Sequence, residues 1–257
     1  MNTNKKSCSQ FGDQRSGESR MRSSGCGNGS RGNGGRGNGH RMDQHGFNAS
    51  TNTSTEPEFM ENEHAEQRAA HLAQIRADIA ASPRGLLTSE ERSDLLLMRE
   101  EEKIARDVYI RLYERWGIRP FQNITGSEQV HMDAMLALLE HYGESDPVRG
   151  LAVGQFYRAD LQALYDDLIH QGLRSEADAV RVGLLIEELD IADLQKVARR
   201  TNKPEILAVY AELERGSRNH LRAFYLWKQK LAIDYVPQHL SSAEFERTGL
   251  SAHEMCH

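Results

Sequence analysis

The stretch from Leu95 to Leu112, LLLMREEEKIARDVYIRL, decides the fold, because its apolar residues recur every three or four positions. That spacing places them on one face of an α-helix. The members of this face are Leu95, Met98, Glu102, Ala105, Tyr109 and Leu112. The run Glu100–Lys103 on its own is typical of a solvated helix face. Glu102, however, interrupts an otherwise apolar stripe, so the pattern predicts a core-facing helix with a carboxylate in its middle.

Helix start and stop signals outside this stretch predict three more helices of similar length. Thr88-Ser89-Glu90-Glu91 has the form of a capping box and Gly117 ends the first helix. We expect long helices at 88–116, 120–142, 175–199 and 204–230, and a short one at 159–170. No run of alternating strand residues appears. The sequence therefore predicts an all-α four-helix bundle whose crossover connection carries the short helix.

Each of the four predicted stripes is apolar at both ends and polar near its middle. The interrupting residues are Glu102 on the first helix, Glu128 and His131 on the second, Glu187 on the third, and Ser217 and His220 on the fourth. A buried carboxylate without a partner lowers the free energy of unfolding by roughly several kcal/mol. Four interruptions at matching heights therefore indicate groups that compensate one another around a cation. Glu128 and His131, three residues apart, converge on one face of their helix.

Composition divides the chain in two. Residues 1–55 hold 11 of the 21 glycines and carry eight basic and three acidic side chains, a net charge of +5, whereas the remainder carries −11. Gly/Asn/Arg repetition around Arg31–Gly39 cannot bury apolar area, so we expect a solvated, disordered arm rather than a nucleic-acid-binding one. The expected domains are a disordered arm at 1–60, an accessory helix with linker at 61–85, the bundle at 86–250, and a frayed tail at 251–257.

The sequence argues against several classes of protein, including membrane-spanning, disulfide-rich and secreted proteins. No stretch of 18 apolar residues occurs, which argues against a membrane-spanning helix. Three cysteines, Cys8, Cys26 and Cys256, do not indicate a disulfide framework. No apolar segment follows the basic start, so no secretory signal is visible and a cytoplasmic location is expected. His253–His257 offers metal-ligand types, but a chain end favours adventitious binding.

Two segments, Glu102–Tyr109 and Ser127–His131, resemble helices of rubrerythrin-like and ferritin-like di-iron proteins. More closely, the chain resembles an uncharacterised bacterial and archaeal domain family of the ferritin-like superfamily over about Leu86–Leu250. The segments that carry this resemblance are Met98–Lys103, Ile186–Leu194, Gly216–Phe224 and Tyr235–Gln238.

The resemblance implies metal ligands at particular positions. They are Glu102, Glu128, His131, a glutamate of the third helix, either Glu187 or Glu188, and His220. Iron is the implied metal, as a di-iron centre, with manganese and zinc left open. The superfamily pattern has a glutamate three residues before the last histidine, where this chain has Ser217. Glu188, Asp190 or Glu214 are the candidates for the missing oxygen, and the alternative is a single or weakly held metal.

The function implied by the resemblance is reaction with dioxygen or peroxide, or oxidation of ferrous ion, with Tyr109 or Tyr142 assisting electron transfer. This would make the protein an oxidoreductase. Two alternatives remain: a non-catalytic metal-binding or sensing protein, and a metal-free helical interaction module with a structural Glu/His network. The expected partners are metal ions and dioxygen or peroxide; a homo-oligomer stays open.

Overall fold

The computed structural model describes residues 56–255, with side chains from Ala65 onward. Within this range the chain is all helical and contains no strand, which confirms the predicted all-α class. The arm expected at 1–60 lies, up to residue 55, outside the described residues. The helices are α1 (Glu56–Ala81), α2 (Ser89–Trp116), α3 (Arg119–Tyr142), α4 (Ala159–Gly172), α5 (Glu176–Ala198), α6 (Pro204–Lys230) and α7 (Ser242–Leu250).

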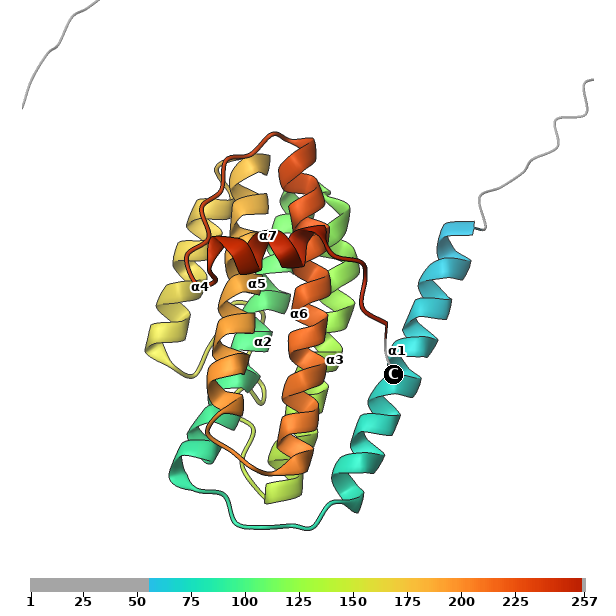
Figure 1. Cartoon of the computed structure of the whole chain (residues 1–257), viewed down its shortest axis with the longest axis vertical. Coiled ribbons are helices and arrows are strands. Elements are labelled where there is room, and N and C mark those ends of the chain that lie inside the picture. The colour runs from blue at the N-terminus through green and yellow to red at the C-terminus, as the bar shows by residue number, and fades with distance from the viewer. Residues whose placement is uncertain (1–55, 256–257) are drawn as a thin grey trace, which may run out of the picture. The chain divides into compact units, whose positions relative to one another are not determined.

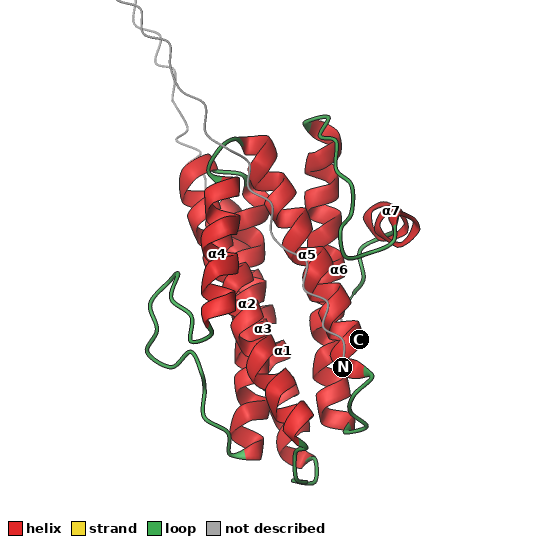
Figure 2. Cartoon of the chain, turned by 90° about the vertical axis from the view of Figure 1, so that its left-hand side faces the viewer, coloured by secondary structure: helices red, strands yellow, loops and turns green. Residues whose placement is uncertain are grey.

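Four long helices, α2, α3, α5 and α6, lie side by side (Figure 1). Short connections join α2 to α3 and α5 to α6, so each pair is antiparallel and packs along its length. The longer connection from α3 to α5 carries α4, which packs against α2 and α5. Outside these four, α1 contacts α3 and α6, and α7 crosses α6, as the turned view in Figure 2 also shows.

The helix ends follow the local signals in the sequence. The Thr88 side chain accepts a hydrogen bond from the Glu91 backbone N–H, and the Glu91 side chain accepts one from the Thr88 N–H. These two bonds satisfy helix N-terminal donors that would otherwise have no partner. At the other ends of α2 and α3, Gly117 and Gly143 adopt left-handed φ values of 63° and 75°, which glycine tolerates without strain.

Two apolar clusters fill the interior and leave a charged layer between them. One contains Tyr109, Phe121 and Phe224, whose rings pack at centroid distances of 5.0 to 5.6 Å. The other contains Leu95, Met135 and Leu213 near the opposite ends of the helices. On each long helix the predicted ligand falls between residues of the two clusters, so the core is apolar above and below one polar level.

The run Glu100–Lys103 is buried, contrary to what it indicates in isolation. Glu100 Oε2 accepts hydrogen bonds from the backbone N–H groups of Tyr157 and Arg158 at 2.8 and 3.1 Å. Lys103 forms an ion pair with Asp107 and donates to the Ala152 carbonyl. The connection before α4 folds over α2 and supplies backbone partners for Glu100 and Lys103.

Two features near the C-terminus differ from the expectation. Helix α7 was not predicted, although Ser241 caps it by accepting from the Glu244 N–H, an S-x-x-E signal visible in the sequence. In the segment expected to fray, Glu254 forms ion pairs with Arg218 and Arg222 of α6. The helices of the described range include no candidate for a membrane-spanning segment.

Candidate metal centre

Five of the six predicted ligands meet in the polar layer between the apolar clusters. Glu102 comes from α2, Glu128 and His131 from α3, Glu187 from α5, and His220 from α6. All five are buried, the two histidines being the most exposed at 7 %. We call these five residues the candidate centre. Their ligand atoms form two overlapping groups that share Glu128.

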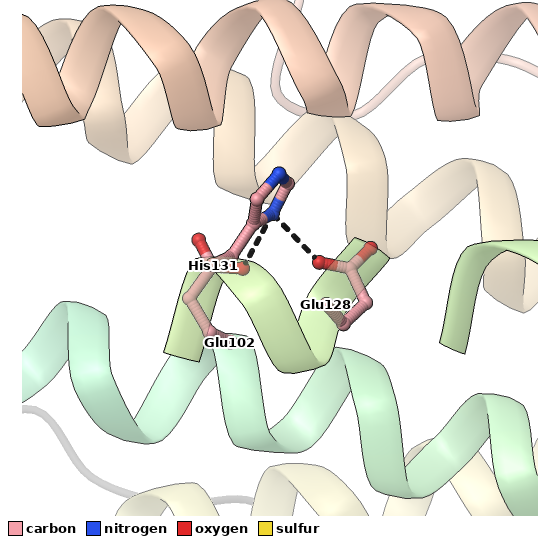
Figure 3. Close-up of side chains that lie close together, drawn as sticks. All are labelled: Glu102, Glu128 and His131. Atoms are coloured by element: carbon pink, nitrogen blue, oxygen red, sulfur yellow. Dashed lines mark hydrogen bonds and ion pairs between the residues drawn. The ribbon is translucent and has the colours of Figure 1, made fainter. Parts of the chain in front are cut away.

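The first group joins α2 to α3 and is drawn in Figure 3. His131 Nδ1 lies 2.9 Å from Glu128 Oε2 and 3.1 Å from Glu102 Oε2. The three side chains point toward one another from neighbouring helices. One ring nitrogen carries at most one proton, so it cannot fully neutralise two carboxylates at once.

The second group joins α3 to α5 and α6. His220 Nδ1 lies 2.8 Å from Glu128 Oε1 and 3.5 Å from Glu187 Oε2. The two oxygens of Glu128 therefore face one imidazole each. The contacts of His220 Nδ1 are not aligned as hydrogen bonds: Glu128 Oε1, Glu187 Oε2 and His220 Nδ1 are all buried without a hydrogen-bond partner in the described part of the chain.

The charges of the centre perturb one another strongly. Burial raises the pKa of Glu102 to about 7, against the lowering effect of His131. Burial disfavours a charged His220, but Glu128 and Glu187 outweigh it and raise its pKa to about 9. Burial likewise opposes a charged His131, and Glu102 and Glu128 hold its pKa well above the usual value. In the metal-free centre the neighbouring carboxylates therefore favour the protonated form of both imidazoles.

The donor set fits a divalent transition metal. Carboxylate oxygens and imidazole nitrogens are the ligands of iron, manganese and zinc. Buried polar atoms without hydrogen bonds lower stability unless another charge compensates them, and a cation bound by Glu128, Glu187 and His220 would do so. Because Glu128 offers one oxygen to each group, two ions held side by side fit this arrangement.

Of the two tyrosines singled out from the sequence, one lies at the centre. The Tyr109 hydroxyl donates to Glu187 Oε1 at 2.5 Å, which leaves Oε2 of that carboxylate turned toward His220. Burial, followed by the charge of Glu187, raises the pKa of Tyr109 well above its usual value. Tyr142 instead donates to Glu205 of α6 and belongs to neither group.

Glu188, the sixth predicted ligand, is not brought into the candidate centre. Its Oε2 accepts backbone N–H groups of Gln238, His239 and Leu240 at 2.8, 3.0 and 3.1 Å. Glu188 therefore holds the connection between α6 and α7. Adjacent helical residues point about 100° apart, so Glu187 and Glu188 face different neighbours.

Helix α6 carries two small residues, Gly216 and Ser217, next to the centre. Ser217 stands where the ferritin-like pattern described above has a glutamate. The Ser217 hydroxyl donates to the Leu213 carbonyl of its own helix. At Gly216 a Cβ would lie 2.4 Å from His131 Nε2, so the imidazole rests directly on the α6 backbone. The role of Gly216 has no signal in residue spacing, because it depends on which side chain of α3 approaches α6.

A cavity of about 360 Å³ reaches the two imidazoles of the centre. It lies among α1, α3 and α6, and its lining includes Arg68, His71, Glu212 and His253 as well as His131 and His220. His71 is hydrogen-bonded to Glu212 at 3.1 Å along this wall. The cavity gives small molecules a way to the histidine side of the centre.

Comparisons with known proteins place the chain in a family. The model of an uncharacterized protein domain, DUF2202, matches residues 91–252, which include every predicted ligand. The uncharacterized protein MJ0754 of Methanocaldococcus jannaschii is 45% identical over 168 residues, 65% of this chain and 91% of that protein. A crystal structure of hypothetical protein MJ0754 from Methanococcus jannaschii matches with a TM-score of 0.65 and 45% identity, covering 67% of this chain and 98% of that one. With the family model spanning α2 to α7, this chain belongs to the DUF2202 family.

Proposed function

We propose that this protein is a ferritin-like metal-binding protein whose candidate centre holds two iron-type ions and acts in oxidation by dioxygen or peroxide. The observation that carries this proposal is the pair of buried Glu/His groups sharing Glu128, in the second of which His220 Nδ1 lies within 3.5 Å of an oxygen of Glu128 and of Glu187 without forming a hydrogen bond. The side-by-side packing of α2, α3, α5 and α6 supports the ferritin-like assignment, because that superfamily places its ligands on four facing helices.

The roles of the chain's own residues follow from their positions. Glu102 and His131 would hold one ion, Glu187 and His220 the other, and Glu128 would bridge them. Bound iron supplies one-electron and oxygen chemistry. Both imidazoles must lose their protons to act as ligands, so loading the centre releases protons.

The surroundings of the centre suit a small oxidisable or oxidising substrate. The two apolar clusters exclude water from both ends of the polar layer. The cavity beside His131 and His220 admits molecules of the size of peroxide or dioxygen, or a hydrated ferrous ion. Tyr109, hydrogen-bonded to Glu187, is placed to pass a proton or an electron to the centre.

The test is the metal content per chain of untagged protein purified without chelator, compared with the Glu128→Ala/His131→Ala variant. We expect about two iron or manganese atoms in the wild type and none in the variant, because Glu128 belongs to both groups. His71→Ala/Glu212→Ala is the matched control: it removes another hydrogen-bonded His/Glu pair outside the centre and should keep its metal.

The outcomes separate the candidate functions. Two atoms together with consumption of dioxygen or peroxide support an oxidoreductase. Metal without turnover favours the storing or sensing alternative, for which the Ser217 position is the specific observation. No metal in a protein that is fully helical contradicts the proposal and leaves a structural Glu/His network.

A further inference from the structure

The cavity beside the candidate centre is larger than dioxygen or peroxide requires. Its volume is about 360 Å³. A water molecule takes up roughly 30 Å³ in the liquid, so an oxidant of two heavy atoms would leave most of this space unfilled. Protein cavities that bind organic ligands measure about 300 to 1,000 Å³. The size of the cavity therefore fits a small organic molecule.

The cavity is built partly by the bundle and partly by segments that flank it in the sequence. Helices α3 and α6 contribute the face with His131 and His220, whereas α1 lies across from them and the exposed His253 completes the lining. Both α1 and His253 lie outside residues 91–252, which the family model matches. The flanking segments therefore enclose a space that the bundle alone leaves open.

Each of the three helices places an apolar side chain in the wall of the cavity. These side chains are Ile75 of α1, Val130 of α3 and Leu213 of α6. Leu213 is buried, and the other two are half-buried. Covering such surface removes it from water, which favours an occupant that has a hydrocarbon part.

Arg68 of α1 brings a positive charge to the same cavity. Its guanidinium lies against α3 at Gly126, where a Cβ would be 3.2 Å from Arg68 Cζ, so the missing side chain allows this close approach. Arg68 is half-buried and makes no hydrogen bond or ion pair within the described part of the chain. The planar N–H fork of a guanidinium matches the two oxygens of a carboxylate.

Glu212 is the only acidic residue in the described lining, and other side chains compensate its charge. Its Oε2 accepts a hydrogen bond from Arg215 Nη2 at 2.6 Å and lies 3.1 Å from His71 Nε2. Glu212 therefore does not neutralise Arg68. The cavity has a surplus of positive charge, which favours an anion.

Contacts of the next residue, Glu254, hold His253 at the cavity. Glu254 forms ion pairs with Arg218 and Arg222 of α6, and its backbone N–H donates to Asn219 Oδ1 at 2.9 Å. These contacts fix the C-terminal segment on α6. An imidazole N–H of His253 offers an anion in the cavity a second hydrogen-bond donor.

We propose that this cavity binds an aliphatic monocarboxylate, with its carboxylate on Arg68 and its hydrocarbon chain against the apolar wall. The inference goes beyond the proposed function, because none of these contacts needs a bound metal. It names the chemical class of molecule that is held on the histidine side of the candidate centre.

The experiment titrates metal-free, full-length protein by calorimetry with acetate, butyrate and hexanoate, and with hexanamide as the uncharged counterpart of hexanoate. Arg68→Gln removes the charge and keeps a long polar side chain. Arg76→Gln is the matched control, because Arg76 lies on the same helix but does not line this cavity. The NMR signals of the His71 and His253 imidazoles report whether the ligand enters the cavity.

We expect a single hexanoate to bind to the wild type and to Arg76→Gln, and to shift both imidazole signals. Affinity should rise about fourfold for each buried methylene from acetate to hexanoate. Arg68→Gln should bind hexanoate about 10- to 100-fold more weakly, because a charge-assisted hydrogen bond is lost. Hexanamide should bind weakly to both proteins.

Arg68→Lys keeps the charge without the fork and should retain part of the affinity, which provides a second reading if Arg68→Gln does not fold. Equal hexanoate affinity in the wild type and Arg68→Gln, equal affinity for hexanoate and hexanamide, or no binding to the wild type would overturn the inference. A wild type that takes up hexanoate but no metal overturns the proposed function and supports this inference, and one that takes up metal but no carboxylate does the reverse.

Discussion

Glu187 and Glu188 are neighbours on α5 and are equally buried, yet they belong to two different regions of the molecule. Glu187 lies in the candidate centre, where Tyr109 is its hydrogen-bond donor and one oxygen has none. Glu188 lies under the α6–α7 connection, where three backbone N–H groups converge on one of its oxygens. Each carboxylate has one buried oxygen without a hydrogen-bond partner in the described range, Oε2 of Glu187 and Oε1 of Glu188. The difference is that Glu187 lies beside Glu128 and His220, whereas Glu188 binds backbone amides.

Glu100 on α2 repeats the second arrangement, since it accepts two backbone N–H groups of the connection before α4. We call Glu100 and Glu188 the loop anchors. A buried carboxylate that accepts amide N–H groups stabilises the fold without any added ion. A buried carboxylate beside other acids and imidazoles needs a cation or a proton. The comparison therefore separates acids that serve folding from acids available for binding.

The largest expected effect comes from removing a loop anchor. Glu188→Ala removes the acceptor of three backbone N–H groups, one of them buried, and hydrogen bonds to a charged group contribute about 1.5–3 kcal/mol each. We expect a loss of about 3 kcal/mol or more in the free energy of unfolding, measured by urea denaturation of the metal-free protein. Molecules that remain folded should bind metal with the wild-type stoichiometry.

Glu187→Gln is the matched change at the neighbouring residue. It should leave the stability of the metal-free protein within about 1 kcal/mol of wild type, because it removes one of several clustered negative charges. Metal binding should fall by at least one equivalent. If Glu188→Ala lost metal while Glu187→Gln lost only stability, the assignment of the two regions would be reversed.

A smaller effect is expected at Gly216, where the α6 backbone approaches His131. In Gly216→Ala the new Cβ would lie 2.4 Å from Nε2, so the imidazole must move away from α6 and leave its present position relative to Glu102 and Glu128. We expect a roughly 10- to 100-fold loss of metal affinity in calorimetry, as for displaced ligand supports in other sites.

The control for this change is Gly126→Ala on α3, where a Cβ would meet the guanidinium of Arg68 at 3.2 Å. That side chain is long and can shift, and alanine favours the helix by about 1 kcal/mol. Gly126→Ala should therefore bind metal normally. Equal metal affinity in the two alanine variants would mean that metal binding does not depend on the present position of the His131 imidazole.

The comparison can also be tested by pH, whose effect has opposite signs on metal binding and on folding. His220 has a pKa of about 9 in the metal-free fold, so below that value metal must displace a proton. Affinity should rise about tenfold per pH unit for each proton displaced as the pH increases toward 9. Calorimetry in two buffers of different ionisation enthalpy counts these protons.

The metal-free protein should respond in the opposite direction. Because the folded pKa of His220 is raised, its contribution to stability is complete below about pH 6.5 and is lost as the pH rises through 9. Denaturation at pH 6.5 and pH 9 measures this loss. Proton release near zero at pH 7 together with tight metal binding would contradict the charged state assigned to the imidazoles.

Much of the fold was accessible from the sequence. The capping box at Thr88 and the glycines at 117 and 143 predicted the ends of α2 and α3 closely, because these signals act within one turn of the helix. The interrupted stripes predicted that Glu128 and His131 face the interior. Helix α7 carried a comparable signal at Ser241 but is short, and its apolar face alone did not identify it.

The candidate site was accessible only in part. Helical periodicity could not separate Glu187 from Glu188, because both neighbours of the stripe end up buried and their difference depends on residues 238–240, about fifty positions away. The burial of Glu100 depends in the same way on the backbone at 157–158. Long-range partners of this kind leave no local pattern.

The sequence by itself determined that the described chain is helical, that four long helices carry acids or imidazoles at one level, and that Glu128 and His131 share a face. These properties follow from local backbone preferences and from the 3.6-residue period. The tertiary structure decided which acids receive amide donors and which are left beside the two imidazoles. A carboxylate's role in the interior depends on what other segments bring within hydrogen-bonding distance, and packing alone determines that.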